Sequence, residues 1–179
     1  MALRTIVQDG DPILNKVCRP VTRFDDRLAE LLDDMHETMI KADGVGLAGP
    51  QVGMLRRLFV VWDTTDAPDE LPEDYVYPFI DFINPEILEV SEEEETKYEG
   101  CLSFPGHNGA VTRPVAVKVR AQDRHGEWFE LEAEDMLARC IQHENDHLDG
   151  ITIMQSSEFF YEDTEEGRAE AAQKAKEKR

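Results

Sequence analysis

The sequence of 179 residues has only three cysteines, Cys18, Cys101 and Cys140, and it lacks any long apolar run. Three thiols are too few for a disulfide scaffold and cannot all pair, so each is interpreted as a buried thiol, a metal ligand or a nucleophile. No stretch approaches the roughly 18 consecutive apolar residues of a membrane-spanning helix. The first residues also lack the apolar segment of a secretory signal peptide. We therefore expect a cytoplasmic protein with no membrane partner.

Basic residues are scarce as well, since 19 Lys and Arg stand against 39 Asp and Glu, for a formal net charge of −20. Binding along nucleic-acid phosphates needs clustered positive side chains, so we expect no DNA partner. The end of the chain is a local exception, where Glu170 and Glu177 are outnumbered by five basic residues. These are Arg168, Lys174, Lys176, Lys178 and Arg179. This count alone motivates the hypothesis that the basic C-terminus contacts the ribosome.

The length is that of one domain, because it supports a single sizeable core and is too short for two. No internal repeat or long linker divides the chain. We expect one domain over residues 1–155, followed by a tail over residues 156–179 that is acidic first and then basic. The Ala, Glu and Lys content of this tail predicts that it is helical in part.

Apolar periodicity predicts two helices. Over residues 25–42 the apolar positions recur at three- and four-residue steps, with Asp25 as N-cap and Gly44 as the stop. The same pattern covers residues 134–148 and ends before Gly150. One stripe of this second helix is aliphatic, and the adjacent stripe carries sulfur and imidazole side chains.

Between the helices the pattern predicts loops and strands. Residues 44–53 hold four glycines and a proline, which is typical of a loop. The acidic, proline-containing residues 63–78 indicate a surface excursion, and residues 91–95 an acidic turn. The expected strands are 58–62, 79–90 with an interruption at Asn84-Pro85, and a hairpin of 115–119 with 129–133.

The motif that carries chemistry is His-Glu-Asn-Asp-His at residues 143–147. Spacing of i, i+4 on a helix places His143 and His147 on one face, where both imidazoles can bind the same cation. Glu144 beside them can act on a metal-bound water. The alternative to a metal site is that both histidines are ordinary solvent-exposed residues of a helix.

A catalytic site of this kind needs a third protein ligand and an open position. A thermolysin-like protease would use a glutamate downstream, but only the acidic tail follows, with Glu158, Glu162, Glu165 and Glu166. The other obvious donor is Cys101, whose thiolate a cation would stabilise. Its neighbour Gly100 lets a backbone come close, which suits a ligand beside a substrate groove.

Three segments together resemble one family. They are Gly-Val-Gly-Leu-Ala-Gly-Pro-Gln at 44–51, Glu-Gly-Cys-Leu-Ser at 99–103 and Gln-His-Glu-Asn-Asp-His at 142–147. Their order and rough spacing are similar to the three signature motifs of peptide deformylases, and the resemblance extends over about residues 6–154. It implies an α+β fold in which small antiparallel sheets surround the central helix that bears the histidines.

The resemblance also implies an activity and a site. A peptide deformylase removes the N-formyl group from the N-terminal methionine of newly synthesised polypeptides, and residues 1–155 would then be its catalytic domain. The implied metal ligands are Cys101, His143 and His147. Glu144 would be general base and acid for attack by metal-generated hydroxide, and Gln51 with the Leu102 backbone N–H would stabilise the oxyanion. The implied cofactor is one divalent ion, Fe²⁺ by resemblance, although such a site also accepts Zn²⁺, Ni²⁺ or Co²⁺.

The resemblance also suggests which residues contact the substrate and which support the metal ligands. Backbone groups of Gly44, Val45 and Gly46 would pair with an extended formyl-methionyl peptide as with an added strand. The candidate walls of the methionine pocket are Val45, Leu102, Met136 and Cys140, although Met136 and Cys140 are equally compatible with ordinary core positions. We expect Asp146 and Arg113 to form an ion pair that braces the metal ligands.

Two other functions compete with deformylation. A zinc endopeptidase built on the same helix would tolerate loss of Cys101, whereas a deformylase would lose its metal. An inactive formyl-peptide-binding homologue would have no use for Glu144 and Gln51, which are both present. Gly49 and Asn145 depart from the usual family residues, and neither is a proposed ligand, base or oxyanion donor.

Overall fold

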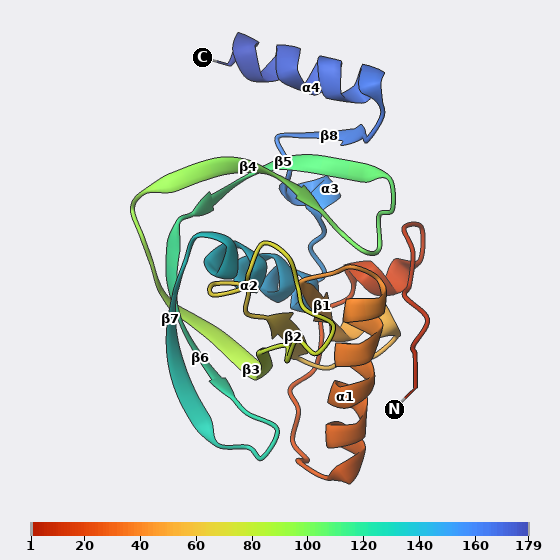
Figure 1. Cartoon of the computed structure of the whole chain (residues 1–179), viewed down its shortest axis with the longest axis vertical. Coiled ribbons are helices and arrows are strands. Elements are labelled where there is room, and N and C mark those ends of the chain that lie inside the picture. Colours follow the sequence, from red (N-terminus) through yellow and green to blue (C-terminus); the bar gives the residue numbers. More distant parts are fainter. Residues whose placement is uncertain (1, 179) are drawn as a thin grey trace.

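Helix α2 (Asp135–Leu148) lies between two antiparallel sheets in the computed structural model, which describes residues 2–178 (Figure 1). The larger sheet has the strand order β1-β2-β3-β6-β7. These strands are β1 (Gly46–Ala48), β2 (Leu58–Trp62), β3 (Phe79–Val90), β6 (Ala116–Gln122) and β7 (Trp128–Glu134). The smaller sheet has the order β4-β5-β8, formed by β4 (Glu94–Gly100), β5 (His107–Pro114) and β8 (Phe159–Glu162). The expected α+β architecture is confirmed.

The remaining helices are peripheral to α2. They are α1 (Asp26–Lys41), α3 (Ile153–Ser156), α4 (Glu165–Glu177) and the short 3-10 turns η1 (Pro12–Asn15) and η2 (Gly49–Val52). The Asp25 carboxylate caps α1 by accepting the backbone N–H of Leu28, as its position in the sequence predicts. No helix in the described part of the chain is long and apolar enough to cross a membrane.

Two apolar clusters hold these layers together. In the first, Ile141 and Leu148 of α2 pack with the stacked rings of Phe59 and Phe82 from the larger sheet. In the second, the apolar face of α1, which includes Met35 and other fully buried side chains, covers the opposite side of β1 and β2. The burial of both helix faces is what fixes α2 in the centre of the molecule.

Several local predictions are confirmed and others are wrong. Both long helices, the strand 58–62, the hairpin and the irregular excursion 63–78 are present. Strand β3 continues through the predicted interruption, because Asn84 adopts a positive φ of 49° within a β-bulge. Part of the predicted glycine loop is a strand, since Gly46–Ala48 pairs with β2. The acidic turn ends early because β4 begins at Glu94.

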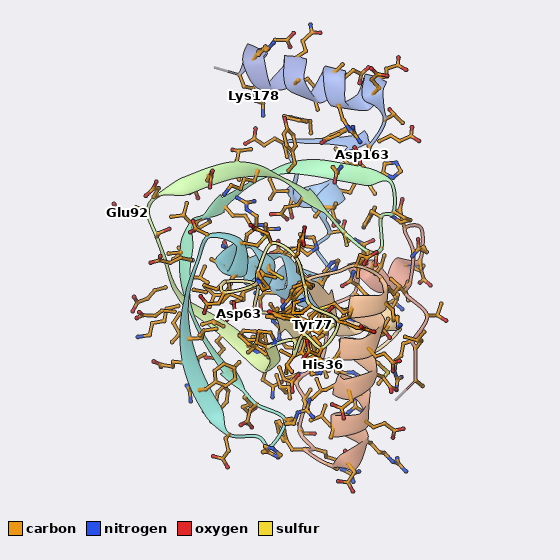
Figure 2. The ribbon with its side chains drawn as sticks, in the orientation of Figure 1. His36, Asp63, Tyr77, Glu92, Asp163 and Lys178 are labelled. Carbon is orange, nitrogen blue, oxygen red and sulfur yellow. The ribbon has the colours of Figure 1, made fainter. Side chains whose placement is uncertain are left out.

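Aromatic side chains link the end of the excursion to α1 by way of β3, near the labelled Tyr77 and His36 in Figure 2. Phe79 stacks between them, with ring centroids 4.1 Å from His36 and 5.8 Å from Tyr77. His36 also lies 2.7 Å from Asp81, to which Arg124 donates at 2.8 Å. Burial alone would raise the pKa of Asp81, but the hydrogen bonds from His36 and Arg124 hold it below its usual value.

The predicted tail continues the smaller sheet before it becomes a helix. Strand β8 pairs with β5, and α4 then lies alongside β8, between the labelled Asp163 and Lys178 in Figure 2. Two basic side chains of the tail are paired locally: Arg168 of α4 with Asp163 at 2.6 Å, and Lys178, which follows α4, with Glu158 at 2.7 Å. The division into residues 1–155 and 156–179 stays a prediction.

Candidate metal centre

Helix α2 directs both histidines of the motif toward the interior. The rings of His143 and His147 lie one helical turn apart with centroids 5.1 Å from each other. Both residues are at most 9% exposed, because the face that carries them also packs toward the sheets. Burial removes the solvated-histidine alternative.

Cys101 joins the two histidines from the end of β4. Its Sγ lies 3.4 Å from Nε2 of His147, and one donor atom from each of Cys101, His143 and His147 lies within 4.8 Å of the other two. Among the described residues this is the sole cluster of three such donors. One thiolate and two imidazoles form a donor set suited to a divalent transition metal, and a fourth position is left for water or substrate. Cys101 supplies the third donor atom, whereas a thermolysin-like protease would supply it from a glutamate downstream of the histidines.

Glu99 holds His143 in orientation. Its carboxylate accepts from Nδ1 of His143 at 2.9 Å, so that Nε2 of the ring is turned toward Cys101. Arg113 donates two hydrogen bonds to the same carboxylate, at 2.7 and 2.9 Å. Burial would raise the pKa of Glu99, but the hydrogen bonds from His143 and Arg113 lower it to about 2. Glu99 is therefore ionised at neutral pH beside the three candidate ligands.

Two further residues complete this network. Arg113 also donates to Asp146 at 2.8 Å, so the residues expected to pair do lie together. Arg139 donates to Glu99 at 2.7 Å and to the backbone carbonyls of Val111 and Glu95 at 2.9 and 2.6 Å. The buried carboxylate thus faces two guanidinium groups and one imidazole.

Glu144 is placed to exchange a proton within the site. It is 4% exposed, its Oε1 lies 4.0 Å from Nε2 of His143, and its Oε2 has no hydrogen-bond partner among the described residues. Burial raises the pKa of this carboxyl to about 7, with the positive charge of His143 opposing the rise. A carboxyl that titrates near neutrality can accept and return a proton at physiological pH. Gly46 makes room for it, since a Cβ there would overlap the Glu144 carboxylate.

Gln51 and Leu102 approach the same point from two other segments. Nε2 of Gln51 lies 3.5 Å from Sγ of Cys101, and its Oε1 accepts the backbone N–H of Ala48 at 2.9 Å. Leu102 follows the cysteine directly and lines the same cavity. The residues expected to stabilise an oxyanion thus both lie next to Cys101, one of the three candidate ligands.

The site opens into a cavity of 440 Å³. Each expected contact residue lines it: Gly44, Val45, Gly46, Gly100, Leu102, Met136 and Cys140. Met136 is 54% exposed, so it belongs to the cavity rim, whereas Cys140 is buried with Sγ 3.5 Å from the carbonyl of Val45. Burial, together with the charge of Glu144, keeps the pKa of the Cys140 thiol well above its usual value. Cys140 is therefore a neutral wall of the cavity.

Glu99, Arg139 and Ser103 were not singled out from the sequence. Glu99 contacts His143 and Ser103 contacts Gln51, whereas Arg139 is hydrogen-bonded to the site only through Glu99. Glu99 precedes the cysteine within the second motif, and Arg139 lies one helical turn before His143. Spacing on α2 could have placed Arg139 on the motif face. Its partner Glu99, 40 positions away, could not be identified from spacing.

Comparisons with known proteins agree with this geometry. The profile of the polypeptide deformylase family matches residues 3–159. A peptide deformylase of Agathobacter rectalis is 49% identical over 171 residues, covering 93% of this chain and 100% of the relative. One from Clostridium botulinum is 52% identical over 154 residues, covering 86% of this chain and 96% of the relative. The crystal structure of peptide deformylase from Thermotoga maritima superposes with a TM-score of 0.80 at 41% identity, covering 89% of this chain and 100% of that one. The chain therefore belongs to the polypeptide deformylase family.

Proposed function

We propose that Cys101, His143 and His147 hold one divalent cation, and that with it the protein removes the formyl group from the N-terminal methionine of nascent polypeptides. The enzyme class follows from the family. The observation that carries the assignment of residues is the convergence of three donor atoms within 4.8 Å, beside a buried carboxylate oxygen that has no partner.

The reaction adds water across the formyl amide and breaks its C–N bond, which yields formate and a free α-amine. When bound, the cation lowers the pKa of water and polarises the formyl oxygen. Glu144 takes the proton from the attacking water. The Gln51 amide and the Leu102 N–H donate to the oxygen that becomes negative, each worth roughly 3 kcal/mol in the transition state. Glu144 then gives its proton to the leaving nitrogen, so that the amine departs.

The substrate peptide binds along the free edge of β1. This strand is the last of its sheet, so its outer backbone edge, continued by Gly44 and Val45, can pair with an extended chain. The Gly44 N–H and the Val45 carbonyl are already bonded to Met39 and Trp62, so other backbone groups of residues 44–46 would make the pairing. Main-chain pairing depends little on side chains, which suits an enzyme that acts on many polypeptides. The methionine side chain then enters the cavity between Val45, Leu102, Met136 and Cys140.

Iron is the proposed native metal. A Cys/His/His site accepts Fe²⁺, Zn²⁺, Ni²⁺ or Co²⁺, and the family resemblance favours Fe²⁺. A ferrous ion with a thiolate ligand and an open position is sensitive to oxygen. This agrees with the cytoplasmic location that we propose, because thiols stay reduced there.

We also propose that residues 1–155 form the catalytic domain and that the basic end of residues 156–179 contacts the ribosome. Among the described residues, Lys174 and Lys176 of α4 form no ion pair, and their helix lies at one end of the molecule, beyond β8 (Figure 1). Deletion of residues 168–179 should abolish co-sedimentation with ribosomes and leave turnover of a short peptide unchanged. Undiminished co-sedimentation would remove this partner.

The decisive test of function is anaerobic purification, elemental analysis and measurement of amine release from a formyl-methionyl peptide. We expect about one metal ion per chain and rapid release of the amine. Cys101→Ser should lose both the metal and the activity, whereas an endopeptidase would tolerate this change. A metal-loaded protein that cleaves internal peptide bonds and leaves formyl-methionine intact would contradict the proposal.

A further inference from the structure

Ser103 is fully buried beside the Gln51 side chain. It follows Leu102 in the segment between β4 and β5, and it is 0% exposed. Its Oγ accepts a hydrogen bond from Nε2 of Gln51 at 3.1 Å. The Ser103 side chain forms no hydrogen bond to the histidines or Glu144 in the described structure, so its hydrogen-bonded link to the site runs through Gln51.

The Gln51 amide is held at both ends. Ala48 donates its backbone N–H to Oε1, and Ser103 accepts from Nε2. Reversal of the amide would set its NH₂ group against the Ala48 N–H, donor against donor, so one orientation is strongly favoured. An amide NH₂ has two hydrogens. With one directed to Ser103, the other points toward the candidate ligands, where Nε2 donates a long hydrogen bond to Sγ of Cys101 at 3.5 Å.

The distance between the two segments is also fixed by the N-terminal chain. Val7 donates its backbone N–H to the carbonyl of Gln51 at 2.8 Å, and Asp9 donates to the carbonyl of Ser103 at 2.8 Å. A single extended piece of backbone therefore bridges η2 and the segment after β4. Because both backbones are held, the contact between the serine hydroxyl and the amide does not depend on the cation.

We propose that Ser103 is a positioning residue for deformylation: its hydroxyl holds one N–H of Gln51 so that the second N–H is aimed at the developing oxyanion. This inference rests on the proposed role of Gln51 as an oxyanion donor. The serine touches neither the substrate nor the reacting atoms. Its effect belongs to the transition state, in which the oxygen carries negative charge, more than to the bound substrate.

The test is a double-mutant cycle on the metal-loaded enzyme. Gln51→Ala should lower kcat by about 100- to 1000-fold, as loss of an oxyanion donor does. Ser103→Ala should lower kcat by about tenfold, the upper range for one hydrogen bond, with KM nearly unchanged. The double variant should be no slower than Gln51→Ala alone, because the serine acts only through the glutamine. Metal content and Tm are measured for each variant.

Ser157→Ala is the matched control, because the Ser157 hydroxyl is also buried and has no partner among the described residues. It should leave kcat and KM unchanged. A Gln51→Ala enzyme with full kcat would overturn the role of Gln51. If Gln51→Ala is slow, three results would overturn only the positioning role of Ser103. These are full kcat in Ser103→Ala, loss of metal from Ser103→Ala, or an equal fall in kcat when Ser103→Ala is made in the wild-type enzyme and in Gln51→Ala.

Discussion

Replacement of Glu99 by glutamine removes one negative charge from the base of the metal centre while preserving its size. The Glu99 carboxylate is 6% exposed and accepts four hydrogen bonds, from Arg113, Arg139 and His143. A glutamine keeps one acceptor oxygen and turns an NH₂ group toward donors on the other side. At least one guanidinium or imidazole N–H is then left facing a donor.

The expected loss is large because the cations remain buried. Removing one partner of a buried ion pair costs about 3–5 kcal/mol in the free energy of unfolding. Asp146 stays 2.8 Å from Arg113 and compensates part of this, so we expect about 3 kcal/mol for Glu99→Gln. Loss of the acceptor behind His143 should also weaken metal affinity by about 10- to 100-fold.

Urea denaturation of the metal-free protein measures the first effect, and competition with a chelator measures the second. Glu95→Gln is the control, since the Glu95 side chain is exposed and pairs only with Lys97 at 2.9 Å, a contact worth about 0–1 kcal/mol. Equal stability and equal metal affinity in the two variants would refute the reasoning, because they would mean that Glu99 carries no more energy than a surface charge.

Three further changes have defined outcomes. Gly46→Ala places a methyl group against the Glu144 carboxylate, and we expect kcat to fall by about 100-fold with metal content retained; steady-state kinetics and elemental analysis check this. In Gly49→Ala the new Cβ would lie 2.7 Å from the carbonyl oxygen of Met54, so the urea midpoint should drop by the equivalent of about 1–3 kcal/mol. Asp81→Asn should cost stability above about pH 5, and the cost should shrink toward pH 3, because a lowered carboxyl pKa stabilises the fold only while the group is ionised. A difference in unfolding free energy that stays constant with pH would contradict this last prediction.

The sequence predicts those parts of the fold in which apolar residues repeat. The faces of α1 and α2 and the hairpin after Pro114 carry apolar residues at regular intervals, so periodicity locates them. The strand 58–62 is a continuous apolar run that is almost fully buried, so composition locates it. Strand β4 has no such stripe. Its one buried residue is Glu99, which is a charged side chain, and a pattern of apolar burial cannot reveal it.

The candidate site divides in the same way. His143, Glu144 and His147 lie within about one helical turn, so their spacing identifies them in the sequence. Cys101 is identified because a metal site of this kind needs a third donor. The residues that orient them come from distant segments. Glu99 meets its partners 14 to 44 positions away, and a single sequence does not say which of many charges will meet in the interior.

X-ray absorption spectroscopy of the zinc-loaded protein tests the central claim most directly, because it counts the sulfur and nitrogen ligands of the metal. The account predicts one sulfur at about 2.3 Å and two imidazole nitrogens at about 2.0 Å. Cys101→Ser should no longer retain zinc, and any zinc forced on at high concentration should show no sulfur ligand, whereas Cys140→Ser should keep the sulfur signal. A metal bound by the two histidines without sulfur, or one that keeps its sulfur when Cys101 is replaced, would contradict the assignment of the centre.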